Sequence, residues 1–269
     1  MVCAGCGGAG SSDGEQTSVV ASFYPLAYAA ADVGGPSVRV RNLTPAGAEP
    51  HDLEATPGDV EELQDADLVL LLGHGFQPQL EDAAGDGDHV LRLLDTPRLN
   101  RLEGGDIHVW LDPLRYAVLV KRIARELGRP DKVERLERRL RALDREYQEG
   151  LADCSRREIV TNHAAFGYLA DRYGLEQIPI TGASPEGEPS PQDLERAVDA
   201  VRETGATTVF VEPLASARVV ETIAREAGVQ TAVLNPIEGL TEGEQAAGDD
   251  YFSLMRANLA TLREALGCR

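Results

Sequence analysis

Three of the five histidines lie where a strand-like run gives way to a loop, and their side chains could bind a metal ion: His51, His108 and His163. Neutral imidazole is the commonest protein ligand of Zn²⁺, and ligands collect at the carboxyl ends of strands in open α/β sheets. The second nitrogen of a metal-binding imidazole is normally held by a carboxylate or a carbonyl group. Asp52 and Asp106 are near enough in sequence to serve in this way.

The residues around each histidine are more specific than the spacing, which fits no short motif such as His-Glu-x-x-His. The three segments read Glu-Pro-His51-Asp-Leu, His108-Val-Trp-Leu-Asp-Pro and Thr-Asn-His163-Ala-Ala-Phe-Gly-Tyr-Leu. Together they closely resemble the metal-binding loops of the substrate-binding lipoproteins of zinc and manganese ABC importers, over nearly everything from Val19 to Leu266. The resemblance implies that the first two histidines come from an N-terminal lobe and that the third opens a C-terminal lobe.

A fourth ligand is implied in the late segment Leu-Asn235-Pro-Ile-Glu238-Gly-Leu. Many members of the family have an aspartate directly before this proline. Here that residue is Asn235, whose neutral amide is a poor Zn²⁺ ligand. Members that resemble this chain more closely use the glutamate, which matches Glu238, and Glu212 is a rival carboxylate that we expect to act in an outer-shell or interlobe role.

Three imidazoles and one carboxylate suit Zn²⁺, whereas Mn²⁺ sites favour more carboxylate oxygen. We therefore expect Zn²⁺ as the captured ion and Mn²⁺ as the less favoured alternative. Zinc-importing members often carry a histidine-rich loop before the second histidine, but residues 82–105 contain only His89. We interpret His74 and His89 as surface or loop residues.

Composition limits the partners. The chain has 269 residues with 26 Lys and Arg against 45 Asp and Glu, a formal net charge of −19. This charge opposes binding to nucleic acid or to anionic lipid headgroups. No stretch approaches the roughly 20 apolar residues of a spanning helix, so we expect contact with a membrane only through a lipid anchor.

The elements that must position the histidines alternate between β-branched runs and helical patterns, which argues for parallel sheets covered by helices. This pattern occurs in both halves of the chain. We predict two Rossmann-like α/β lobes with the metal site in the cleft between them. The predicted boundaries are a tether at 1–17, an N-terminal lobe at 18–118, a helical connector at 119–154 and a C-terminal lobe at 155–269.

The connector contains an apolar stripe at three- and four-residue spacing: Leu136, Leu140, Leu143 and Tyr147. Such a stripe indicates one face of a long, rigid helix. In the second lobe, Ser190-Pro-Gln-Asp193 has the composition of a capped helix start.

Cysteines mark both ends of the chain. Ala4-Gly5-Cys6 resembles the end of a bacterial lipoprotein signal, so Cys6 is a candidate for lipidation, although Cys3 stands where that signal usually has leucine. The alternative is two thiols with no role. Cys154 and Cys268 could form a disulfide in an exported protein, or could be two buried thiols.

These observations together predict an extracytoplasmic, lipid-anchored and monomeric solute-binding protein that captures Zn²⁺ for an ABC permease. The alternatives are a zinc hydrolase, with Glu212 or Glu49 as the base, and a surface adhesin. A hydrolase needs an open metal position. The one Gly-x-Ser-x-Gly pattern, at 10–14, falls within the predicted tether and not at a predicted strand-to-helix turn, where it would support catalysis, and the chain contains no His-Glu-x-x-His motif.

Overall fold

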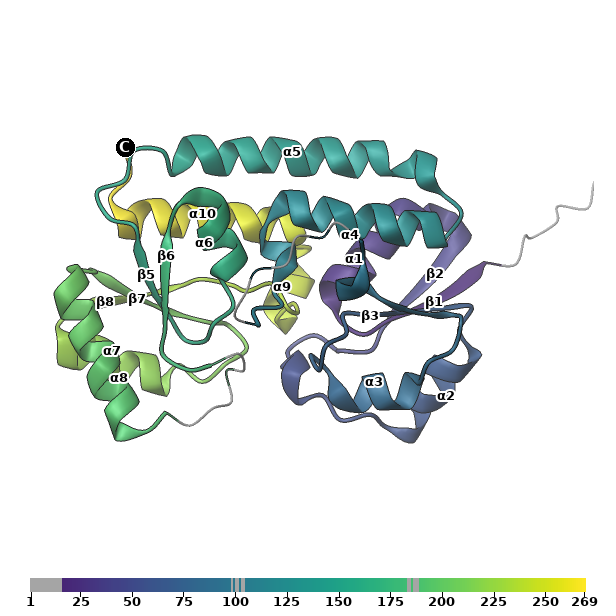
Figure 1. Ribbon diagram of the computed structural model, residues 1–269, viewed down its shortest axis with the longest axis horizontal. Coiled ribbons are helices and arrows are strands. Elements are labelled where there is room, and N and C mark those ends of the chain that lie inside the picture. The colour runs from purple at the N-terminus through teal and green to yellow at the C-terminus, as the bar shows by residue number, and fades with distance from the viewer. Residues whose placement is uncertain (1–15, 98, 100–101, 103–104, 183–184, 186–188) are drawn as a thin grey trace, which may run out of the picture.

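The computed structural model describes residues 16–97, 99, 102, 105–182, 185 and 189–269. These residues form two α/β lobes with parallel sheets (Figure 1), which confirms the predicted fold class. Cys6 and most of the predicted tether lie outside the described residues.

The N-terminal lobe contains a sheet of order β2-β1-β3-β4 in which every pair is parallel. Its strands are β1 (Thr17–Ala21), β2 (Val38–Asn42), β3 (Leu68–Leu71) and β4 (Val90–Arg92). Its helices are α1 (Tyr24–Gly34), α2 (Pro57–Asp65), α3 (Pro78–Ala84) and α4 (Pro113–Glu126). Every residue of β3 is buried, as expected for a strand covered on both faces.

The C-terminal lobe repeats this strand order as β6-β5-β7-β8, again with parallel pairs. Its strands are β5 (Glu158–Thr161), β6 (Glu176–Pro179), β7 (Thr208–Val211) and β8 (Gln230–Val233). Its helices are α6 (Gly167–Tyr173), α7 (Pro191–Thr204), α8 (Arg218–Ala227), α9 (Glu242–Ala247) and α10 (Tyr251–Leu266). The predicted cap of α7 is present, because Ser190 and Asp193 form a reciprocal capping box.

The helical segment between the sheets is divided into two helices. Residue 119, where the connector was predicted to begin, lies inside α4. Gly128 has a positive φ of 66° and Pro130 opens a short 3-10 turn, η5 (Pro130–Lys132), so α4 ends there and α5 (Val133–Gly150) begins anew. Of these two helices, α5 extends along both lobes (Figure 1).

The predicted stripe on α5 is buried. Leu136, Leu140, Leu143 and Tyr147 are all 0% exposed and belong to a core cluster with residues of both lobes. Burying one such leucine stabilises the fold by about 1.5–3 kcal/mol. The stripe therefore fixes the connector against both lobes. Among the described helices, none has the length and apolar composition needed to cross a membrane.

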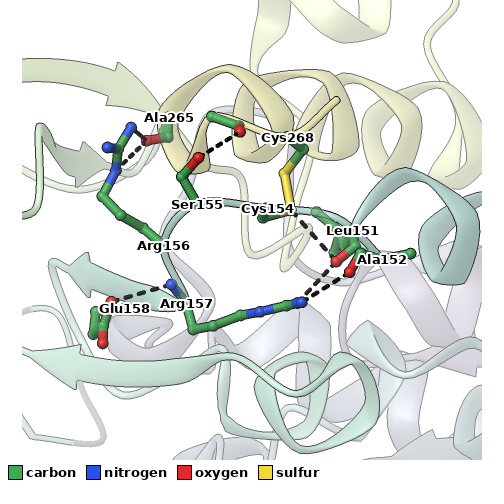
Figure 2. The surroundings of a disulfide bond; sticks show 10 residues. Leu151, Ala152, Cys154, Ser155, Arg156, Arg157, Glu158, Ala265 and Cys268 are labelled. Carbon is green, nitrogen blue, oxygen red and sulfur yellow. Dashed lines mark hydrogen bonds between the residues drawn. A yellow bond between two sulfur atoms is a disulfide. The ribbon is translucent and has the colours of Figure 1, made fainter.

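The two cysteines near the second lobe are bonded in this structure. Cys154 follows α5 and Cys268 follows α10, and their sulfur atoms form a disulfide (Figure 2). Neighbouring contacts join the same two segments: Ser155 Oγ donates to the Gly267 carbonyl over 3.2 Å, and Arg156 Nη2 donates to the Ala265 carbonyl over 3.0 Å. The end of α10 is thereby held against the start of β5.

We expect the disulfide to form in the exported protein and to stabilise it. It closes a loop with a sequence separation of 114 residues, so the double variant with serine at Cys154 and Cys268 should lose about 2–5 kcal/mol of unfolding free energy. Chemical denaturation measures this loss. Non-reduced peptide mapping that finds both thiols alkylated without prior reduction would contradict the prediction.

Candidate metal centre

His51 lies in a 3-10 turn, η2 (Pro50–Asp52), that follows β2. Glu49 caps this turn, because its carboxylate accepts a hydrogen bond from the backbone N–H of His51 over 3.2 Å. The imidazole packs edge-on against the Phe76 ring, with 4.7 Å between ring centroids. Burial, together with the charge of nearby Glu238, raises the pKa of Glu49 to about 8. Glu49 therefore lies close to Glu238 as well as to the His51 turn.

His108 is held from one side by Asp106. The same Asp106 oxygen lies 2.8 Å from the backbone nitrogen and 2.8 Å from the Nδ1 atom of His108. The 3-10 turn η4 (Val109–Leu111) begins directly afterwards. This hydrogen bond places the proton on Nδ1 and directs Nε2 into the centre, as is usual for a metal-binding imidazole.

His163 lies just after β5 and is held by Glu212, which lies just after β7. One Glu212 oxygen is 2.6 Å from His163 Nδ1, and the other accepts from the His163 backbone N–H over 3.1 Å. Gln177 adds a third restraint, because its amide donates to the His163 carbonyl over 2.8 Å. The imidazole therefore has a single orientation set by the ends of adjacent strands.

Glu238 follows β8 and brings one carboxylate oxygen to all three histidines. Its Oε1 atom lies 3.5 Å from His51 Nε2, 3.0 Å from His108 Nε2 and 3.4 Å from His163 Nε2. The Nε2 atoms of His108 and His163 are 3.3 Å apart. All four candidate ligand atoms lie within 4.8 Å of one another.

This centre is buried, and two of its polar atoms have no hydrogen-bond partner in the part of the chain that the structure describes. The side chains of His108 and His163 are 0% exposed and that of Glu238 is 1% exposed, and His51 retains 8%. Within the described residues, His51 Nε2 and Glu238 Oε1 are buried atoms without a hydrogen-bond partner. Buried polar atoms are otherwise almost always paired. Converging acceptors of this kind fit a cation.

The charges of the centre depend on one another. Burial lowers the pKa of His163, but Glu212 and Glu238 outweigh this effect and raise it to about 10. Burial likewise opposes protonation of His108, yet Asp106 and Glu238 raise its pKa. Burial raises the pKa of Glu238, but the neighbouring imidazoles outweigh burial and lower it well below its usual range. These opposed shifts favour a charged Glu238 carboxylate beside a protonated His163.

The structure brings together the four residues named from the sequence. Asn235 does not join them, because its side chain bonds to Glu244 and to the Ile237 backbone. Asp106 acts on an imidazole as expected. Asp52 makes no hydrogen bond to a histidine within the described residues, and Glu49 is the acid that contacts the His51 turn.

The other two histidines lie away from this cluster. His74 Nε2 is 2.8 Å from an Asp95 oxygen in an exposed pair. His89 is only partly exposed and lies in a turn, so both positions agree with the interpretation of these residues as surface or loop histidines.

Sequence reasoning missed a direct link between the two lobes. The Trp110 indole, two residues after His108, donates to the Pro236 carbonyl over 2.7 Å. It therefore joins the loop of His108 to the loop of Glu238. The tryptophan lies in one of the motifs quoted from the sequence. No local feature of the sequence indicates that it bonds to Pro236, which is 126 residues away.

Comparisons with known proteins agree with this geometry. Residues 19–265 match the family described as zinc-uptake complex component A, periplasmic. The chain is 36% identical to zinc-binding protein AdcA of Streptococcus pyogenes serotype M6 over 92% of its own length, but it spans 56% of that longer protein.

Two solved structures each match 93% of this chain. The Zn(II)-bound ZnuA-like domain of AdcA from Streptococcus pneumoniae has a TM-score of 0.78, 34% identity and 99% of its own chain covered. The laminin-binding protein Lmb of Streptococcus agalactiae, described as having adhesin and metal-transporting activity, has a TM-score of 0.84, 31% identity and 99% coverage. Since the family match spans nearly the whole chain, the protein belongs to the zinc-uptake component A family of substrate-binding transport proteins.

Proposed function

We propose that this chain captures one Zn²⁺ ion outside the cytoplasm through His51, His108, His163 and Glu238, and delivers it to an ABC permease. The observation that carries the proposal is the convergence of three Nε2 atoms and one carboxylate oxygen in a buried centre. Three imidazoles and one carboxylate match the tetrahedral ligand preference of Zn²⁺ better than the oxygen-rich preference of Mn²⁺. Membership of the family supports the permease as the partner.

The same geometry favours binding over catalysis. A catalytic zinc usually keeps one position for water, whereas here four protein groups supply four ligand atoms. Glu212, a candidate base for a hydrolase, uses both carboxylate oxygens to hold His163. We therefore propose a binding protein rather than an enzyme. We also propose that a lipid on Cys6 anchors it to the outer side of the membrane and that it works as a monomer.

Zinc binding should release protons and strengthen as pH rises. The raised pKa of His163, about 10, means that this imidazole is protonated near neutrality, and a protonated imidazole cannot coordinate. The pKa of His108 is raised as well, by Asp106 and Glu238. For each proton displaced, zinc affinity should therefore fall about tenfold for every unit by which the pH is lowered. We expect at least one proton per zinc at pH 7.

Calorimetric titrations in buffers of different ionisation enthalpy, repeated between pH 5 and 8, measure the zinc stoichiometry and the protons released. A screen for zinc-dependent hydrolase activity on the same sample separates the enzyme alternative. Affinity that does not change across this pH range, or a stoichiometry other than one zinc per chain, would contradict the proposal.

A further inference from the structure

The backbone before Glu238 has a conformation that its sequence does not favour. Ile237 has a φ of 56° and its side chain is 0% exposed. A β-branched residue rarely adopts this left-handed conformation, because its side chain crowds the backbone. Such strained residues persist where surrounding contacts determine the conformation, and they cluster at ligand-binding sites. Some part of the structure must therefore impose the path of this loop.

Asn258 on α10 makes two hydrogen bonds with the start of this loop. Its side-chain Oδ1 accepts from the Asn235 backbone N–H over 2.8 Å, and its Nδ2 donates to the Asn235 carbonyl over 2.7 Å. The side chain thus pairs with both backbone groups of one residue, as a neighbouring strand would. Asn258 is 2% exposed, so these groups would be buried without partners if its amide were removed.

Asn235 transmits this restraint towards the ligand. Its Oδ1 atom accepts from the backbone N–H of Ile237 over 2.7 Å, and its Nδ2 atom donates to Glu244 Oε1 over 2.9 Å. The first of these bonds holds the strained residue that directly precedes Glu238. A path of hydrogen bonds therefore leads from α10 to the residue directly before the candidate carboxylate ligand.

The same helix also contacts the loop of His108. Tyr251, at the start of α10, donates from its hydroxyl to the Trp110 carbonyl over 2.6 Å. Trp110 in turn contacts Pro236, as described above. Helix α10 is thus connected to a ligand loop from each lobe.

We infer that Asn258 is a positioning residue for Glu238: its amide holds the loop of residues 235–238 in the conformation that brings the carboxylate to the three histidines. This inference rests on the proposed zinc site and adds a residue that does not itself contact the ion. It predicts that removing the amide weakens zinc binding through Glu238 and not through general loss of stability.

The test compares Asn258→Leu, which keeps the branching and the number of side-chain heavy atoms but removes the amide, with Asn258→Ala as a smaller second variant. The matched control is Tyr147→Phe. The Tyr147 hydroxyl donates to the Met255 carbonyl over 2.6 Å, so this variant also removes one buried hydrogen bond to α10, but away from the ligand loops. Zinc affinity, thermal unfolding of the metal-free protein and the absorption spectrum of the Co²⁺-loaded protein are measured for each variant.

We expect each Asn258 variant to lower zinc affinity by about tenfold or more, the range typical of outer-shell groups, while Tyr147→Phe stays within about twofold of the wild type. The Co²⁺ spectrum of Asn258→Leu should shift towards that of Glu238→Gln. In a Glu238→Gln background, Asn258→Leu should add less than about a threefold loss, because the two changes affect one ligand.

Wild-type affinity in both Asn258 variants would overturn the inference, and so would an equal loss with and without Glu238. Wild-type affinity in Glu238→Gln would instead overturn the assignment of Glu238 as a ligand, and the inference with it. The two failures are therefore distinguishable within one set of proteins.

Discussion

His163→Ala should lower zinc affinity by at least about a hundredfold, beyond the loss that outer-shell changes usually cause. The change leaves three ligand atoms in place of four, and it leaves Glu212 buried without the imidazole that it holds. An incomplete shell also admits water and reduces the free energy that binding contributes to folding. We expect large losses for His51→Ala and His108→Ala for the same reason.

The matched control is His74→Ala, which removes an imidazole outside the centre. Its zinc affinity and stoichiometry should equal those of the wild type in calorimetric titration. If any one of the three ligand variants retained wild-type affinity and stoichiometry, that histidine would not belong to the site.

Glu238→Gln should lower zinc affinity by at least about tenfold, and by more than Asn235→Ala. A carboxylate offsets one unit of the charge on the ion, whereas an amide offsets none. Asn235→Ala should act only through the shape of the loop, because its side chain points to Ile237 and Glu244.

Competition against a fluorescent zinc chelator gives this ranking directly, and it includes Glu212→Gln as a third variant. A reversed order of Glu238 and Asn235, or the largest loss at Glu212, would mean that the carboxylate ligand has been misassigned. The three histidines could still form the site in that case.

Much of the fold can be predicted from the sequence because its signals are local. The β-branched runs predicted β2 and β5, which precede His51 and His163, and the stripe from Leu136 to Tyr147 predicted a helix with one buried face. The prediction of a strand before His108 is wrong, because the described residues 105–107 are not in a strand. The strand β4 has no comparable sequence signal, because Val90–Arg92 is too short to show a period. The connector was predicted as one helical segment because the composition on both sides of Gly128 favours helix, but the helical path breaks there with a positive φ.

The four candidate ligands were identified from the sequence motifs around them. The residues that hold these ligands in place could not be identified in this way, because their contacts depend on the tertiary structure. Asp106 could be suggested because it lies two residues from His108, whereas Asp52 is directly adjacent to His51 and does not play that part. The contact of Glu212 with His163 follows from the pairing of β5 with β7, which sequence spacing cannot supply. Asn258 is further from any local signal, because it lies 23 residues from Asn235 on another element.

The most direct test of the central claim is the metal content and coordination of protein purified without an affinity tag or added metal. X-ray absorption should find one zinc per chain with three nitrogen ligands and one oxygen ligand at about 2.0–2.2 Å. An oxygen-rich shell, bound Mn²⁺ in place of zinc, or a zinc ion that keeps a water in its fourth position would contradict the account.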